Sequence, residues 1–383
     1  MQYLKDRAWA EVSLDAVEEN YAMMRAYLPA GTEIIAVLKA NGYGHGAVPV
    51  AKTLEKAGCS KMAVASIEEA MELRENGVSV PILLLGPIPV SYLEIAAKNE
   101  LIVPLTDPEY AAEISGTARQ LGLSVRAAIM LDCGLSRLGV VVKGREEEAV
   151  QDVLRLAALP NLELDSVMTH LTAGGIPEQH ELNLEQLNRF KDFTDALERA
   201  GLHLPKHCAA SRFSVRYPEY AFDCVRIGSD LYGVHPYYGV GPHFKPAMQL
   251  RARIVQIKEV GANTLVGYGP KYKTEKPTRI AVLPIGYVDG LTTRLGDKMC
   301  FLLHGKRVRQ IGRLCMDYCM VDITEIPEAV TGDIVTLFGE DEGAFLSVQE
   351  HAAIYGGTAS ELICLLGRRI PRFYFKGEQP VLL

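Results

Sequence analysis

Strand-like and helix-like patterns alternate about eight times over the first 240 residues, and this alternation limits the folds open to the chain. The strand-like segments are mostly uninterrupted apolar runs, such as residues 80–85 and 125–131, which is typical of parallel strands buried on both faces. Residues 14–28 show apolar side chains at helical spacing, and similar helical segments follow most of the strands. The number and order of these segments predict an α/β fold with an N-terminal (β/α)8 TIM-like barrel.

A doubly wound sheet of the Rossmann type is the alternative arrangement. It would require the pattern GxGxxG directly after the first strand, with an acidic residue about 20 positions later. Glycines do follow the predicted strand at residues 34–39, but the spacing of Gly42, Gly44 and Gly46 does not match that pattern. The barrel is therefore the favoured prediction.

The sequence changes character after Pro242, where short β-prone runs replace the alternating pattern. These runs are broken by Gly, Asp and Pro, and few helical patterns separate them; they cover residues 250–260, 279–283, 300–303, 307–311 and 334–338. We therefore predict two domains, a barrel at residues 1–242 and a mostly β domain at residues 243–383.

The composition indicates a globular protein, with 48% hydrophobic and 23% charged residues. A net charge of −7 argues against nucleic-acid binding, and no apolar run approaches the roughly 18 residues of a membrane span. The first seven residues are charged and lack the apolar core of a secretory signal. The eight cysteines are scattered without zinc-like spacing. We expect a cytoplasmic protein with reduced thiols, no metal site and no membrane partner.

A lysine ends the apolar strand at residues 34–39, and a glycine-rich turn and a helix follow it. Burial disfavours the ammonium form of Lys39 and lowers its pKa, which suits an amine that forms a Schiff base. The glycines of the turn and the helix start behind them favour an anion such as a phosphate. This combination suggests an aldehyde cofactor with a phosphate tail. The ordinary alternative is a solvated lysine beside a structural turn.

Polar residues at the ends of several predicted strands support a site for an anionic ligand. In barrel enzymes the chemistry is located at the carboxyl ends of the strands. Each residue alone has an ordinary explanation, such as an ion pair, a satisfied core histidine or a helix cap. Taken together they favour a binding site; they are Lys39, Arg137, His170, Ser211 and Arg226.

The string AVLKANGYGHG at residues 36–46 resembles the cofactor-lysine motif of the alanine racemases. Further segments are similar to motifs of the same family and occur in the same order along nearly the whole chain. They are MTHL at 168–171, VRIGSDLYG at 225–233, VGYGPKY at 266–272, LPIGYVDG at 283–290 and IGRLCMD at 311–317. The resemblance implies the barrel with a C-terminal β domain, pyridoxal 5'-phosphate as cofactor, and racemisation of alanine that supplies D-amino acid for peptidoglycan.

The resemblance also implies roles for individual residues. Lys39 would form the Schiff base with the cofactor, and Lys39 and Tyr268 would be the two catalytic acid/base groups. The residues implied in cofactor binding are Lys39, Tyr43, His170, Ser211, Arg226, Gly228, Ser229 and Tyr232. Those implied in substrate binding are Arg137, Tyr287, Met316, Asp317 and Ser360. The family further implies a head-to-tail homodimer, in which the C-terminal domain of one subunit completes the barrel site of the other.

The implied mechanism has a physical logic. Inversion at Cα needs a base on one face and an acid on the other, and Lys39 and Tyr268 would each need a pKa below the ordinary value. Nearby cations such as Arg137 would favour a tyrosinate. Arg226 would face the pyridine nitrogen of the cofactor. Because a guanidinium only donates hydrogen bonds, that nitrogen would be an unprotonated acceptor, which should limit transamination.

Three positions depart from the family pattern. Many members carry a carbamylated lysine where this chain has Met130, so Arg137 must be held by another group, such as Asp132, a chloride ion or water. Ala210 replaces an asparagine beside the phosphate-binding serine. Ser360 aligns with a tyrosine that closes the substrate pocket. Serine-racemising members, including the vancomycin-resistance type, carry a smaller polar residue there, so a serine or dual-specificity racemase is the alternative.

Two other classes of protein fit the sequence less well. A decarboxylase of the related barrel family for basic amino acids should carry an acidic substrate site and its own cysteine motif, and the segments at 266–272 and 311–317 argue against it. A non-catalytic cofactor-binding protein would consist of the barrel alone. The C-terminal domain with its candidate acid Tyr268 argues against that class.

Overall fold

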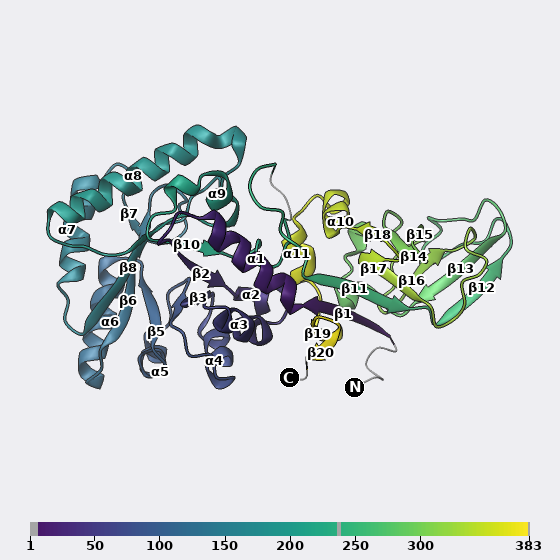
Figure 1. The fold of residues 1–383 in the computed structure, drawn as a ribbon, viewed down its shortest axis with the longest axis horizontal. Helices are drawn as coiled ribbons and strands as arrows, with labels where there is room; N and C mark the ends of the chain where they lie inside the picture. Colours follow the sequence, from purple (N-terminus) through teal and green to yellow (C-terminus); the bar gives the residue numbers. More distant parts are fainter. Residues whose placement is uncertain (1–6, 236–238, 382–383) are drawn as a thin grey trace.

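The computed structural model describes residues 7–235 and 239–381, which form two domains lying side by side (Figure 1). The barrel domain is on the left of Figure 1 and the mostly β domain on the right. Residues 1–6 lie outside the described residues. They make up most of the N-terminal segment that we expect not to be a secretory signal. In the described part of the chain, no helix combines the length and apolar character needed to cross a membrane.

Eight parallel strands form the barrel and confirm the predicted fold. Their order is β10 (Cys224–Ile227), β2 (Glu33–Val37), β3 (Lys61–Val64), β4 (Ile82–Leu84), β5 (Leu101–Leu105), β6 (Val125–Asp132), β8 (Leu162–Met168) and β9 (Lys206–His207). The ring closes between the last strand and the first, where the N–H of Arg226 donates to the carbonyl of Ala209 at 2.9 Å and Ala210 forms a parallel bridge with Arg226. A short strand, β7 (Val140–Val141), pairs with the end of β6.

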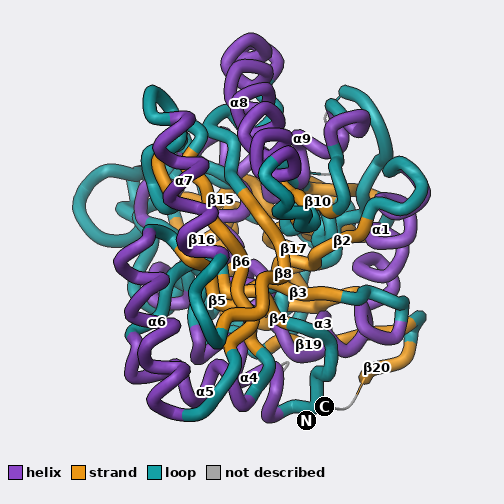
Figure 2. The backbone as a smooth tube through the Cα atoms, turned by 90° about the vertical axis from the view of Figure 1, so that its left-hand side faces the viewer, coloured by secondary structure: helices purple, strands orange, loops and turns teal. Residues whose placement is uncertain are grey.

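Helices surround these strands, as Figure 2 shows. They are α1 (Leu14–Tyr27), α3 (Ala47–Lys56), α4 (Ile67–Glu75), α5 (Leu93–Lys98), α6 (Pro108–Leu121), α7 (Glu146–Ala157), α8 (His180–Arg199) and α9 (Ser211–Arg216), with 3-10 turns η2 (Val90–Tyr92), η3 (Pro177–Gln179) and η4 (Pro218–Tyr220). Several begin where the sequence supplies a cap. The side chain of Ser66 accepts from the N–H of Glu69, and that of Asp107 accepts from the N–H of Tyr110. Local sequence therefore fixes where these helices begin.

The second domain is built on one long sheet. Its order is β12 (Gln256–Val260), β13 (Thr278–Leu283), β16 (Cys319–Asp322), β15 (Lys306–Ile311), β14 (Cys300–Leu303), β17 (Ile334–Asp341), β11 (Met248–Arg253), β1 (Ala8–Ser13), β19 (Arg372–Lys376) and β20 (Gln379–Val381), while β18 (Ala344–Leu346) pairs with β17. Two helices, α10 (Val348–Tyr355) and α11 (Ala359–Cys364), and the turns η5 (Tyr287–Asp289) and η6 (Thr293–Leu295) complete it.

The first strand of the chain belongs to this second sheet. β1 pairs antiparallel with β11 and parallel with β19, and its Trp9 is 1% exposed. The predicted domain boundary between residues 242 and 243 places this strand in the barrel domain. A pairing between strands about 240 residues apart cannot be recognised from a local sequence pattern. Ala8–Ser13 therefore lie in the C-terminal sheet, and the boundary near residue 242 stays a prediction for the rest of the chain.

Candidate active site

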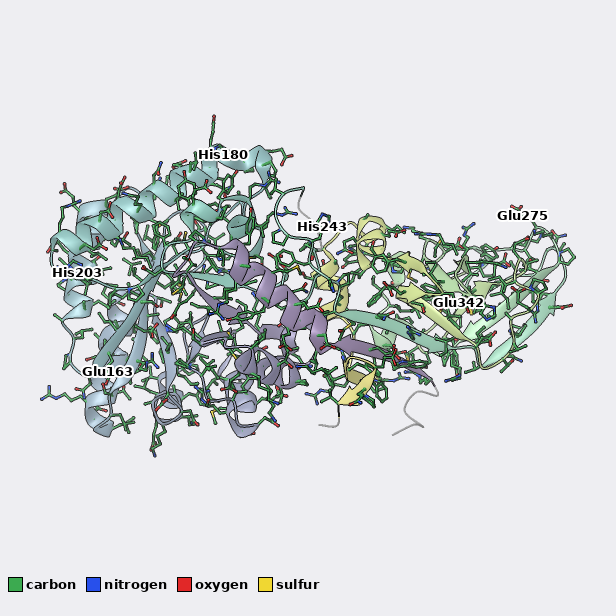
Figure 3. The ribbon with its side chains drawn as sticks, in the orientation of Figure 1. Glu163, His180, His203, His243, Glu275 and Glu342 are labelled. Atoms are coloured by element: carbon green, nitrogen blue, oxygen red, sulfur yellow. The ribbon has the colours of Figure 1, made fainter. Side chains whose placement is uncertain are left out.

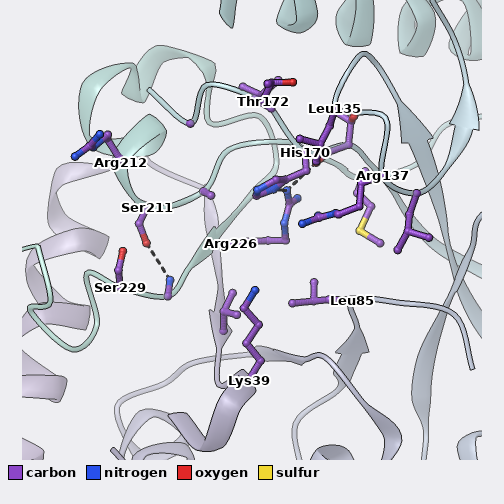
Figure 4. Close-up of a pocket in the computed structure, with 18 of the residues that line it drawn as sticks. Lys39, Leu85, Leu135, Arg137, His170, Thr172, Ser211, Arg212, Arg226 and Ser229 are labelled. Atoms are coloured by element: carbon purple, nitrogen blue, oxygen red, sulfur yellow. Dashed lines mark hydrogen bonds between the residues drawn. The ribbon is translucent and has the colours of Figure 1, made fainter. Parts of the chain in front are cut away.

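A cavity of about 620 Å³ lies at the carboxyl ends of the barrel strands (Figure 4). Parallel strands bring their carboxyl ends to one rim, so residues far apart in the sequence meet there. The predicted site residues that line the cavity are Lys39, Tyr43, Arg137, His170, Ser211, Arg226, Gly228 and Ser229. The structure thus brings together the barrel residues that the sequence placed at strand ends.

An unusual turn presents Lys39 to this cavity. The four residues 40–43 all have positive φ angles, between 52° and 61°. Such angles are uncommon for residues other than glycine and persist only where the surroundings enforce them. Here the Asn41 side chain accepts a hydrogen bond from the N–H of Ala47 at 2.8 Å, which ties the turn to the start of α3. The turn was predicted from the sequence, but its left-handed backbone was not.

The surroundings of Lys39 favour its neutral amine. Burial lowers the pKa of Lys39, and the neighbouring cation of Arg137 lowers it further. The amine therefore loses its proton more readily than an ordinary lysine, and the neutral form is the one that attacks a carbonyl carbon or accepts a proton.

Arg226 lies opposite Lys39 and is 5% exposed. Its Nη1 donates to Nδ1 of His207 at 2.6 Å and to the carbonyl of His207 at 3.0 Å. Its Nη2 donates to the carbonyls of Thr169 at 2.7 Å and Cys208 at 3.0 Å, and lies 3.2 Å from Nδ1 of His170. Burial lowers the pKa of Arg226 to about 10, so the guanidinium stays charged at neutral pH.

His170 contacts Arg226 as a neutral imidazole. Burial lowers the pKa of His170 to about 3, and the cations of Arg226, Arg137 and Lys39 contribute to the shift. Its Nδ1 is therefore free to accept a hydrogen bond from the guanidinium. His207, which makes the shorter contact, was not identified from the sequence, because β9 is too short to show a strand pattern.

A cradle of small and hydroxyl-bearing residues lies beside the lysine. The hydroxyl of Ser211 accepts from the N–H of Gly228 at 3.0 Å. A Cβ at Gly228 would lie 2.5 Å from the Tyr43 hydroxyl, so only glycine allows this approach. Burial raises the pKa of Tyr43 to about 12, which keeps its hydroxyl a donor. Tyr232 packs behind Tyr43 with ring centroids 5.3 Å apart and donates to the carbonyl of Val37 rather than lining the cavity.

Arg137 is exposed within the cavity and free to take an anion. The carboxylate of Asp132 accepts from the N–H groups of Gly134 and Ser136 at 2.9 and 3.0 Å. Among the residues that the structure describes, no hydrogen bond or ion pair joins Arg137 to Asp132 or to another protein group. The possibility that Asp132 holds Arg137 is therefore not realised. Met130 lines the cavity and is 7% exposed.

The candidates from the C-terminal domain lie away from the cavity of their own chain. Tyr268 is 69% exposed, Tyr287 41% and Met316 51%. The loops of Tyr287 and Met316 are joined, because the N–H of Tyr287 donates to the carbonyl of Cys315. Within one chain, the loops with Tyr268, Tyr287, Met316 and Asp317 therefore carry exposed side chains that do not line the cavity of Lys39.

Ser360 also does not line the cavity. It is half-buried in α11, which packs against the turn of Lys39. A Cβ at Gly44 would lie 2.7 Å from the carbonyl of Ile363, so the close contact between helix and turn requires glycine, whose φ is +81° here. Ser360 thus lies near the lysine turn.

Acidification is expected to destabilise the folded protein through its buried histidines. Burial lowers the pKa of His45 to about 4 and that of His170 to about 3. As the pH falls below about 6.5, the unfolded chain binds protons that the folded chain does not, so stability falls by up to about 1.4 kcal/mol per histidine and pH unit. Urea unfolding at pH 7, 6 and 5 measures this slope.

A matched pair of variants tests the cause of that slope. His45→Gln should make it shallower, whereas His203→Gln should leave it unchanged, because His203 is exposed at the outer edge of the barrel domain (Figure 3). Equal slopes in the two variants would contradict the assignment.

The residues around the cavity fit pyridoxal phosphate. Lys39 supplies an amine, the cradle of Tyr43, Ser211 and Gly228 suits a phosphate, and Arg226 lies across the cavity from the lysine. Asp132 is the one acidic residue among those that line it. Nowhere in residues 7–235 and 239–381 do three His, Cys, Asp or Glu side chains gather in a way that would hold a metal ion.

Comparison with known proteins agrees with this fit. Residues 12–236 match the family model described as "Alanine racemase, N-terminal domain", and residues 247–374 match "Alanine racemase, C-terminal domain". The alanine racemase of Clostridium perfringens strain SM101 is 38% identical over 377 residues, which are 97% of this chain and 96% of that protein. The alanine racemase of Desulfovibrio desulfuricans is 37% identical over 96% of this chain and 97% of its own.

Solved structures show the same similarity. The alanine racemase of Clostridium difficile 630 superposes with a TM-score of 0.91 at 34% identity, covering 98% of this chain and 97% of that chain. The alanine racemase of Bacillus anthracis with bound L-Ala-P gives the same TM-score at 31% identity and the same coverage. The similarity therefore extends over both domains.

Proposed function

The chain belongs to the alanine racemase family, and from this premise we propose that it interconverts L-alanine and D-alanine with pyridoxal phosphate in the barrel cavity. The observation that carries the proposal is the arrangement of Lys39, Arg226 and the phosphate cradle around one cavity. The full-length similarity to alanine racemases supports it. In cells the product would supply D-alanine for peptidoglycan in the cytoplasm.

The residues that line the cavity have different roles in this proposal. Pyridoxal phosphate, when bound, withdraws electrons from the substrate Cα and makes its proton acidic. Lys39, with its lowered pKa, removes or returns the proton on one face. Arg137 binds the substrate carboxylate, since its guanidinium is exposed in the cavity and engages no protein group among the described residues. Tyr43, Ser211, Gly228 and Ser229 hold the phosphate.

A second acid/base group must come from another subunit. Tyr268 is 69% exposed on the C-terminal domain and lies outside the cavity of its own chain. We propose a head-to-tail homodimer in which Tyr268 of the partner subunit serves the second face of the substrate. Tyr287 and Met316 of the partner subunit would line the approach to the cavity, and Asp317 of the partner subunit would lie beside them.

The alternatives have less support. The relatives described above are named alanine racemases, so the comparisons do not support the serine alternative, and Ser360 does not line the cavity. The match to the C-terminal family domain argues against a barrel-only cofactor-binding protein and against the decarboxylase class.

Racemisation assays test the proposal directly. Purified protein with added pyridoxal phosphate should racemise L-alanine and D-alanine and prefer alanine to serine, as measured by chiral chromatography. Absence of racemisation with either amino acid would overturn the proposed function, and a preference for serine would overturn the assigned substrate.

A mixed dimer tests whether the sites are shared. Lys39→Ala and Tyr268→Phe subunits, carrying different affinity tags, are each expected to form inactive homodimers. A purified dimer with one subunit of each kind holds one site with both changes and one with neither, so about half of the wild-type activity should return. A mixed dimer as inactive as the homodimers would contradict a shared site.

A further inference from the structure

We propose that His207 is a positioning residue, which fixes the direction in which Arg226 presents its guanidinium to the ring-nitrogen end of the cofactor. The inference rests on the proposed function for the identity of the bound group. The contacts that carry it lie inside the barrel of a single chain.

The contacts of His207 determine which of its ring nitrogens carries the proton. Its Nδ1 lies 2.6 Å from Nη1 of Arg226, and a guanidinium has donors only, so Nδ1 must be an unprotonated acceptor. The proton of the neutral ring is therefore on Nε2, which donates to the hydroxyl of Ser166 at 3.1 Å. His207 and Ser166 are 0% and 1% exposed, so water does not compete for these bonds. Arg226 thus fixes the tautomer, and the Ser166 hydroxyl accepts from the Nε2–H and holds the ring in place.

Arg226 uses the N–H donors of Nη1 and Nη2 within the protein. Both N–H bonds of Nη1 are used by His207, one by its ring and one by its carbonyl. Those of Nη2 are shared by the carbonyls of Thr169 and Cys208 and the ring of His170. Within the described residues, Nε donates to no protein group, yet Arg226 lines the cavity. The Nε–H is therefore the donor left for a ligand.

The shape of the Arg226 guanidinium links the directions of its donors. A guanidinium is planar and rigid, so fixing Nη1 and Nη2 also fixes the direction of the Nε–H. Three of the five acceptors are backbone carbonyls at the ends of barrel strands. The ring of His207 makes the shortest contact and lies deeper than His170, between Arg226 and Ser166 in the barrel interior. His207 is thus the side chain that most strongly sets the orientation of the arginine.

The ionic groups near His207 are paired with one another. Asp165 binds both Lys61 at 2.8 Å and Arg126 at 2.8 Å. Burial lowers the pKa of His207 well below its ordinary value, and the cations of Arg226 and Lys61 add to the effect. The ring is therefore neutral at neutral pH, which leaves its Nδ1 able to accept from Arg226.

Two substitutions at position 207 separate positioning from packing. In His207→Asn the amide oxygen can take the place of Nδ1 and accept from Arg226, whereas His207→Leu fills the space without an acceptor. We expect His207→Leu to bind pyridoxal phosphate about 10- to 100-fold more weakly than wild type, because a charged hydrogen bond is lost. His207→Asn should stay within about threefold of wild type.

Three readouts are needed besides racemisation. The affinity for pyridoxal phosphate and the absorption maximum of the bound cofactor are measured by titration. The third is pyruvate released per racemisation event. In that side reaction alanine passes its amino group to the cofactor and, with water, leaves as pyruvate, while pyridoxal phosphate becomes pyridoxamine phosphate. Misplacement of Arg226 should raise the ratio in His207→Leu and not in His207→Asn.

Controls make the outcomes decisive. Val153→Ala removes buried volume from α7 at a residue that does not line the cavity. It should lower the melting temperature without moving any of the three readouts. If His207→Leu does not fold, Ser166→Ala replaces it. Loss of the acceptor leaves the buried Nε2–H of His207 unpaired and the ring free to shift, so cofactor affinity should fall by at least about threefold.

The result that would overturn the inference is wild-type affinity, absorption and pyruvate ratio in His207→Leu, or a defect in His207→Asn as large as that in His207→Leu. Wild-type protein that binds no pyridoxal phosphate would instead overturn the proposed function. The two failures are therefore distinguishable, because the wild type is measured first.

Discussion

Replacement of Lys39 by alanine is expected to reduce racemisation of both alanine enantiomers by about 10³- to 10⁴-fold. The substitution removes the amine that the turn at residues 40–43 holds at the cavity, and with it the group proposed to exchange the proton on one face of the substrate. Lys39 is the one lysine among the described residues that line the cavity, so no other lysine can take its place. Initial rates in both directions, with saturating pyridoxal phosphate, measure the effect.

The control for this prediction is Lys52→Ala, which removes an exposed lysine from α3, the helix that follows the turn. Its rates should equal those of the wild type. Added methylamine should restore part of the activity of Lys39→Ala and have no effect on Lys52→Ala. A Lys39→Ala enzyme with more than about a tenth of wild-type activity would contradict a catalytic role for the lysine.

The sequence predicts the barrel well because its information is local. The helix expected at residues 14–28 from apolar spacing is α1, which ends one residue earlier, at Tyr27. Buried parallel strands read as apolar runs, and the strand ends give the lining of the cavity. The same arguments fail where the determining contact is distant in sequence.

Two features show what local patterns omit. No local pattern assigns β1 to the C-terminal domain, because its partners β11 and β19 lie about 240 and 360 residues away. His207 occupies a strand of two residues, and its importance comes from Arg226 and Ser166, which are brought to it only by closure of the barrel. Positions such as these are set by topology, so they become visible only in the folded structure.

Asp289 is a third feature whose contacts are distant in the sequence, and it is the basis of a prediction about stability. Its side chain is 0% exposed. Both oxygens accept from Arg7, at 3.0 and 2.6 Å, and Arg369 lies 3.4 Å away. One oxygen also accepts from the N–H of Gly286 at 3.0 Å. A single buried carboxylate thus joins the start of β1, the η5 turn and the segment before β19.

Asp289→Ala is therefore expected to destabilise the C-terminal domain by about 3 kcal/mol, the lower end of the cost of breaking a buried ion pair. The lower end applies because Arg7 and Arg369 are 31% and 46% exposed and regain some solvation. Trp9, the one tryptophan of the chain, lies buried in β1 close to Arg7. Its fluorescence during urea unfolding reports this domain directly.

The matched control is Asp317→Ala, which removes the other carboxylate that binds Arg369, at 2.8 Å. Its side chain is 41% exposed, and exposed ion pairs contribute at most about 1 kcal/mol, so the unfolding midpoint should move much less. Asp289→Asn, which keeps the shape but not the charge, should lie between the two. If Asp289→Ala lost no more stability than Asp317→Ala, the carboxylate would not organise the domain, and the loop of Tyr287 would owe its position to backbone contacts alone.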